Sequence, residues 1–95
     1  MKYVVTNAQY LDGEMTVFEP VRRKTAKEAV DFCVSSAMED YGYNYEVLEE
    51  IVTEETEEID ENPAPHTPVY TLRLDNECGH METYTVFAEN EGGAS

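Results

Sequence analysis

The sequence has very little positive charge: six lysines and arginines stand against 21 aspartates and glutamates, which gives a net charge of −15. A protein that binds the phosphate backbone of DNA or RNA needs a basic surface, so direct nucleic-acid binding is disfavoured. An anionic membrane surface is excluded for the same electrostatic reason. The apolar runs are only a few residues long, far short of a membrane-spanning segment.

Cysteine is equally scarce, because the chain contains only Cys33 and Cys78. Two cysteines are too few for a disulfide scaffold, and the start of the chain does not resemble a signal peptide. We therefore expect a cytoplasmic protein with reduced thiols. A length of 95 residues suits one domain with a single hydrophobic core. We place this domain at residues 1–88 and expect a flexible C-terminal tail at residues 89–95.

The first part of the chain predicts a β-hairpin. Residues 2–10 and 15–22 alternate between apolar and polar side chains, and Asp12-Gly13 separates them. Asp-Gly between two such runs is a strong hairpin signal. Pro20 lies near the end of the second run and indicates an edge position or a bulge.

Residues 26–41 are predicted to form a helix. Thr25 and Glu28 have the spacing of a capping box, in which each side chain accepts a hydrogen bond from the backbone of the other residue. Gly42 suits the C-terminal cap. An apolar stripe with helical spacing predicts the face that packs on a sheet: Ala26, Ala29, Val30, Cys33, Val34, Ala37 and Met38.

The last part of the chain predicts a second pair of strands, at residues 69–74 and 81–87, after a proline-rich loop at residues 62–68. Gly79 supplies a permissive turn position between them. One face of this pair is apolar: Tyr70, Leu72, Leu74, Tyr84 and Val86. Together with a strand near residue 50, the expected order is ββαβββ. This is an α+β domain with a twisted antiparallel sheet and one helix packed on one face.

The acidic residues are concentrated in one segment. Residues 46–61 contain nine acids and no base, whereas residues 1–45 contain seven acids and five bases. Like charges this close together repel one another unless salt or a partner neutralises them. Acidity that serves general solubility, or a halophilic setting, is expected over the whole surface instead. The concentration therefore favours contact with a basic partner, while the solubility interpretation remains the alternative.

The secondary structure of this acidic segment is ambiguous from the sequence. Valine, isoleucine and threonine favour a strand, whereas the glutamates favour a helix that would carry like charges four residues apart. We expect a strand over about residues 45–53, anchored to the core by Val47, Leu48, Ile51 and Val52, and then a solvated segment. Carboxylates two residues apart in a strand lie ~6.6 Å apart, broadly comparable with successive nucleic-acid phosphates.

No motif indicates catalysis, a cofactor or a metal. Cys78 and His80 lie two residues apart, but the paired cysteine spacings of structural zinc sites are missing, and Cys33 belongs to the helix stripe. Asp75-Asn-Glu77 resembles the start of a calcium loop but lacks its later glycine and glutamate. We expect a protein that is not an enzyme and binds no cofactor. A small metal-dependent regulator that uses Cys78 and His80 stays a minor alternative.

In its size, its acidity and the segment EVLEEIVTEETEEIDE, the chain resembles the small inhibitors that phages and mobile elements direct against host defences. Anti-CRISPR and anti-restriction proteins are examples, and the resemblance is one of general character. It implies stoichiometric binding to a basic nuclease or effector complex in the host cytoplasm, in some cases by mimicry of DNA. The residues that we expect to contact the partner are Glu46, Glu49, Glu50, Glu54, Glu55, Glu57, Glu58, Asp60 and Glu61, with Tyr43 and Tyr45 beside them. The alternative is a small accessory or structural domain.

Overall fold

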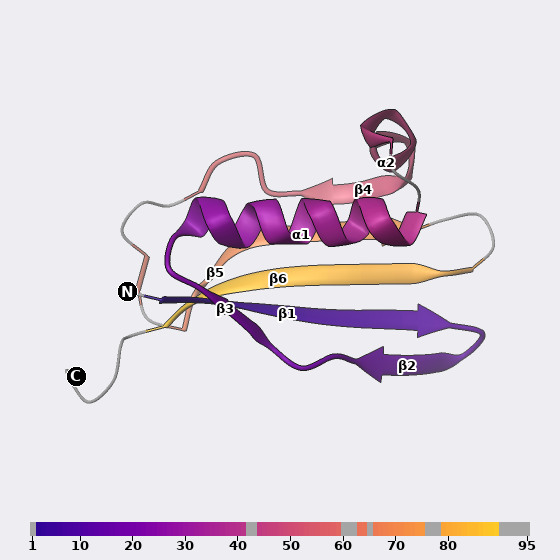
Figure 1. Ribbon diagram of the computed structural model, residues 1–95. Coiled ribbons are helices and arrows are strands. Elements are labelled where there is room, and N and C mark those ends of the chain that lie inside the picture. The colour runs from indigo at the N-terminus through magenta and orange to yellow at the C-terminus, as the bar shows by residue number, and fades with distance from the viewer. Residues whose placement is uncertain (1, 42–43, 60–62, 65, 76–78, 90–95) are drawn as a thin grey trace.

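The computed structural model describes residues 2–41, 44–59, 63–64, 66–75 and 79–89. It has an antiparallel sheet with a long helix across one face, as the ribbon in Figure 1 shows. The predicted α+β class is therefore confirmed. The elements in chain order are β1 (Lys2–Leu11), β2 (Glu14–Val17), β3 (Val21–Arg23), α1 (Ala26–Tyr41), α2 (Tyr45–Ile51), β4 (Val52–Glu55), β5 (Pro68–Asp75) and β6 (Met81–Glu89).

The sheet order is β2-β1-β6-β5-β4, with β3 paired to the N-terminal half of β1. The predicted hairpin is present, and Asp12 and Gly13 both have positive φ angles, of 51° and 85°. Asp tolerates this backbone region and Gly adopts it without strain, as a tight hairpin turn requires. The expected strand 15–22 is divided into β2 and β3 around Pro20, because proline cannot donate to a strand ladder.

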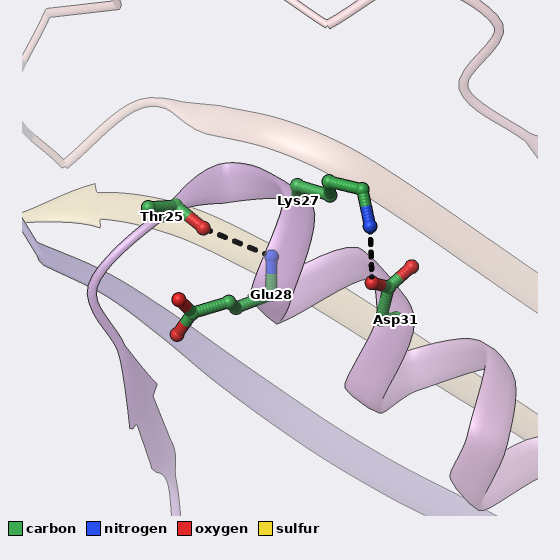
Figure 2. A network of polar contacts seen from close by, with 4 residues as sticks. All are labelled: Thr25, Lys27, Glu28 and Asp31. Atoms are coloured by element: carbon green, nitrogen blue, oxygen red, sulfur yellow. Dashed lines mark hydrogen bonds and ion pairs between the residues drawn. The ribbon is translucent and has the colours of Figure 1, made fainter.

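Helix α1 has the predicted bounds and the predicted buried face. Ala29, Cys33 and Ala37 are fully buried against the sheet, and the small size of these side chains lets the helix lie close to it. At its start, the Glu28 backbone N–H donates a hydrogen bond of 3.1 Å to Thr25 Oγ1, as Figure 2 shows. The reciprocal bond from the Thr25 N–H to the Glu28 carboxylate is not made between these two described residues. The predicted cap at Gly42 lies outside the described residues.

The Thr25 cap leads to a direct test. Thr25→Ala is expected to lower the free energy of unfolding by about 1 kcal/mol, because the Glu28 N–H loses its acceptor. Urea denaturation at neutral pH measures this change. Thr25→Ser, which keeps the hydroxyl, is the control and should retain most of the stability; equal losses in both variants would contradict a capping role.

The core lies between α1 and one face of the sheet. Its fully buried side chains include Leu72 and Leu74 of β5 and Tyr84 and Val86 of β6, which are residues of the predicted apolar face. Tyr70 and Leu72 of β5 stand opposite Val86 and Tyr84 of β6 in the antiparallel register. The turn before β6 includes Gly79 with a φ of 82°, which agrees with the predicted permissive position.

The prediction of a strand over residues 45–53 is wrong for most of its length. Residues 45–51 form the short helix α2, and only Val52–Glu55 form a strand. Asn44 caps this helix: its Oδ1 accepts a hydrogen bond of 2.8 Å from the Glu46 N–H. Leu48 is consequently buried, while Val47 is 43% exposed and does not anchor the segment as expected. The cap and the helix-forming glutamates outweigh the strand preference of valine and isoleucine.

The last strand, β6, extends one residue beyond the expected end of the domain at residue 88. Glu89 does not belong to the expected flexible tail: it is the last residue of β6, and its Oε1 accepts a hydrogen bond of 3.3 Å from Arg22 Nε. Residues 90–95 lie outside the described residues. In the proline-rich loop, the His66 N–H donates to the Ala88 carbonyl at 2.6 Å, which ties the loop to β6.

Candidate functional site

The acidic residues predicted to contact a partner lie on three consecutive structural segments. Seven of them are described and exposed: Glu46, Glu49 and Glu50 on α2, Glu54 and Glu55 on β4, and Glu57 and Glu58 in the bend after β4. We call these seven residues the acidic edge. In Figure 1, α2 and β4 lie at one side of the molecule and β2 at the opposite side. Tyr43, Asp60 and Glu61 lie outside the described residues, as does the side chain of Tyr45.

The acidic edge does not form the single carboxylate row that was predicted for a strand. On α2, Glu46 is three and four residues before Glu49 and Glu50, so these side chains share one helix face. Such helix neighbours have Cβ atoms about 5–6 Å apart. On β4, adjacent residues point to opposite sides of the sheet, and a bulge between Val52 and Glu54 shifts the register. The carboxylates are therefore spread over a helix, both faces of a strand and a bend, and do not form a straight line of charges.

Nearby cations do not neutralise the acidic edge. The ion pairs within the described residues are Arg22–Glu89 and Lys27–Asp31, and both lie on other elements. Arg73 stands opposite Glu54 in the sheet register but makes no ion pair with it. Glu55 accepts a hydrogen bond of 2.7 Å from the Tyr70 hydroxyl, which holds one carboxylate in place. With seven carboxylates and one neighbouring arginine, the acidic edge presents a strong net negative field to solvent.

A hollow opens beside the acidic edge, between α2 and strands β4 and β5. Its volume is about 360 Å³, and its lining combines three apolar residues with two carboxylates: Leu48, Val52, Leu72, Glu49 and Glu55. A basic side chain has an apolar stem and a charged head, so its chemistry matches such a lining. The hollow beside the acidic edge is therefore suited to a lysine or arginine side chain of a partner.

A second carboxyl site is buried, and the sequence analysis did not identify it. Glu82 of β6 is fully buried on the face that packs against α1, beside Leu74 of β5 and Gln9 of β1. The Gln9 side-chain amide donates to Glu82 Oε2 and also to Asp40 Oδ2 of α1, the latter at 3.2 Å. Glu82 Oε1 has no hydrogen-bond partner of normal geometry among the described residues.

The environment of Glu82 favours its neutral form. The pKa of Glu82 is raised to about 7: burial is the largest cause and the neighbouring Asp40 adds to it, while the Tyr84 hydroxyl and the Gln9 amide lower the pKa and offset part of the rise. Strand alternation could have indicated this site, because Glu82 lies two residues before Tyr84 and therefore shares its buried face. The site was not predicted because a polar glutamate is not expected on a buried face.

The described residues hold no group of three or more histidine, cysteine or acidic side chains suited to a metal ion. Cys33 is fully buried in the core, and burial raises the pKa of its thiol to about 12, which makes it a poor ligand or nucleophile. His80 is partly buried beside β6. Cys78 lies outside the described residues, so the alternative of a regulator built on Cys78 and His80 stays a prediction.

Comparison with protein-family models, with curated proteins and with solved structures finds no match to this chain. Within the described part of the chain, no helix has both the length and the apolar character needed to cross a membrane.

Proposed function

We propose that this chain is a non-enzymatic binding protein that inhibits or sequesters a basic, nucleic-acid-binding partner. The partner class that fits best is a nuclease or effector complex of a host defence system, so the chain would act as an anti-CRISPR or anti-restriction inhibitor. The observation that supports the proposal is the acidic edge: seven exposed carboxylates on adjoining segments, with no ion pair to a base within the described residues.

The spacing of these carboxylates supports competition with a nucleic acid. Neighbouring carboxylates on α2 are separated by distances of the same order as the phosphates of a nucleic-acid strand. A channel that binds phosphates with lysine and arginine can therefore bind the acidic edge and release its counterions. Because its carboxylates lie on a helix, a strand and a bend, the acidic edge would fill part of such a channel rather than imitate a straight strand. Its role is to occupy the channel, so no catalytic group is needed.

The test compares two variants that each remove four charges. Glu49, Glu54, Glu57 and Glu58 on the acidic edge are changed to glutamine in the first variant. The control variant changes four exposed acids elsewhere, Glu19, Glu28 and Glu39 to glutamine and Asp75 to asparagine. Both variants have the same net charge, so they separate the position of the acids from their number.

Affinity capture from a host lysate at low and high salt identifies candidate nucleases, and competition with their DNA then measures inhibition. The unaltered chain is expected to displace DNA, with an affinity that falls as salt rises. The acidic-edge variant should lose at least about tenfold in affinity, or about 1.4 kcal/mol, while the control variant binds normally. Equal losses in both variants would indicate that only total charge matters, which favours the alternative of an accessory domain whose acidity serves solubility.

A further inference from the structure

The exposed apolar side chains gather on the β1–β2 hairpin. Among the residues that the structure describes, five of the six large hydrophobic residues with high exposure belong to this hairpin and the residue after it: Tyr10, Leu11, Met15, Val17 and Phe18. Met15 and Val17 are the most exposed of them, at 68% and 69%. The sixth is Val47 on α2. Solvent contact over a contiguous apolar area is unfavourable, and such patches commonly mark interaction surfaces.

Strand β2 is also an open edge of the sheet. It pairs with β1 on one side, and no described strand pairs with its other side. The opposite edge of the sheet, β4, is protected by exposed Glu54 and Glu55 and by a bulge, two features that hinder pairing with another strand. By contrast, β2 carries one charged residue, Glu14 at its start, and the residues that follow it, 15–18, are apolar or threonine.

The side chains of β2 form a pattern that is symmetric about Thr16. Met15 and Val17 stand opposite Tyr10 and Ala8 of β1, on the face of the sheet that α1 does not cover. Thr16 stands opposite Gln9, whose side chain contacts Asp40 of α1, so Thr16 lies on the other face. An antiparallel copy of the strand centred on Thr16 would place each Met15 opposite a Val17 and the two threonines opposite each other.

We propose that β2 is a self-association edge, at which two copies of this chain pair β2 with β2 in antiparallel orientation about a two-fold axis at Thr16. A two-fold interface needs a surface that complements itself, and the Met15–Val17 and Thr16–Thr16 pairs meet this condition. In this register Glu14 lies opposite Phe18 and not opposite a second Glu14. The Met15–Val17 pair would occur twice in the dimer, and the Thr16–Thr16 pair once, on the axis.

If two copies associate, the charge distribution favours contact through the β2 edge rather than through another surface of the chain. Two chains of net charge −15 repel each other, and the acidic edge is where the repulsion is strongest. The strand order places β2 and β4 at opposite edges of the sheet. Four strand spacings separate them, about 19 Å, which exceeds the Debye length of about 8 Å at physiological ionic strength. Pairing through β2 therefore keeps the two acidic edges far apart.

Sedimentation equilibrium over about 10 μM to 1 mM protein measures the association. A monomer–dimer equilibrium is expected, and higher salt should strengthen it by screening the repulsion between copies. This salt dependence is opposite to that expected for the acidic edge and a basic partner, so the two proposals can fail separately. A chain that stays monomeric at the highest concentration in high salt overturns the proposal.

Lysine substitutions at exposed positions locate the interface without disturbing the core. Met15→Lys and Val17→Lys should each weaken dimerisation at least about tenfold, because each places two lysines in the symmetric interface. Val47→Lys, at an exposed position on α2, removes the same net charge and should leave dimerisation unchanged. A dimer that tolerates Met15→Lys and Val17→Lys, or one that Val47→Lys weakens equally, overturns the proposal.

Cross-linking tests the register directly. Thr16→Cys in a Cys78→Ser background is expected to form a disulfide-linked dimer on oxidation, because directly opposed residues in antiparallel strands bring their Cβ atoms within about 5 Å. Val47→Cys in the same background is the control and should remain monomeric under the same conditions. A Thr16→Cys chain that does not cross-link faster than this control overturns the axis at Thr16.

Discussion

Replacing Glu82 by glutamine is expected to stabilise the fold by about 2–3 kcal/mol at pH 8, a large gain for a domain of this size. Glu82 is fully buried, and above its raised pKa of about 7 the folded chain must hold a carboxylate there. Glutamine keeps the shape and an oxygen that can accept from the Gln9 amide, while it removes the buried charge. The substitution should therefore relieve an electrostatic cost without leaving a cavity.

The same group predicts a pH dependence with a definite sign. The folded pKa of about 7 lies above the ordinary value of 4.5, so in this range the folded chain binds a proton that the unfolded chain has lost. Stability from this group is complete below about pH 4.5 and falls as the pH rises to about 7, by about 3 kcal/mol in total. Neutralisation of the surface acids at low pH reduces repulsion as well, which adds to the slope in the same direction.

Urea denaturation of the wild type, Glu82→Gln and a control at several pH values measures both effects. Glu39→Gln is the matched control, because it also removes one charge but from an exposed position on α1. The Glu82→Gln curve should be flatter than the wild-type curve between about pH 5 and pH 8, while Glu39→Gln follows the wild type. A wild-type stability that does not fall over this range, together with a destabilised Glu82→Gln, would contradict a buried carboxyl that titrates near neutrality.

Leu72→Ala is expected to lower the free energy of unfolding by about 2–5 kcal/mol. Leu72 is fully buried in the centre of β5, where it stands between Tyr84 of β6 and Glu55 of β4. Its removal takes apolar contacts from the core and leaves a cavity that the surrounding sheet cannot fill. Because a small domain has about 5–15 kcal/mol of stability, the loss would be a large part of the total.

Leu72 also lines the hollow beside the acidic edge, so its removal should affect that edge first. Hydrogen exchange is expected to show faster exchange in β4 and α2 than in β1, in addition to the lower stability in urea. Val47→Ala is the control, since Val47 is 43% exposed and contributes little to the core. A loss below about 1 kcal/mol for Leu72→Ala, or a similar loss for Val47→Ala, would contradict the proposed role of Leu72.

Much of the fold could be predicted because local signals and tertiary packing agree. The α1 bounds followed from the Thr25 cap and from a stripe that includes Ala29 and Cys33, and both features are present. The hairpin turn followed from Asp12-Gly13, whose backbone angles need those residue types. The strand prediction for the α2 segment was wrong because the helix preference of glutamate and the strand preference of valine and isoleucine are of similar strength there. The Asn44 cap decides in favour of the helix.

The sequence by itself determined the α+β class, the long helix, the hairpins and the local concentration of acids. These properties depend on neighbours along the chain: periodicity, caps, turn residues and charge counts. Only the tertiary structure decided that the acidic edge and the apolar β2 edge lie at opposite sides of one sheet. It also decided that Gln9 of β1 bridges the buried Glu82 of β6 and Asp40 of α1, which brings together residues from three elements. Such features depend on strand order and on contacts between distant segments, which no local pattern encodes.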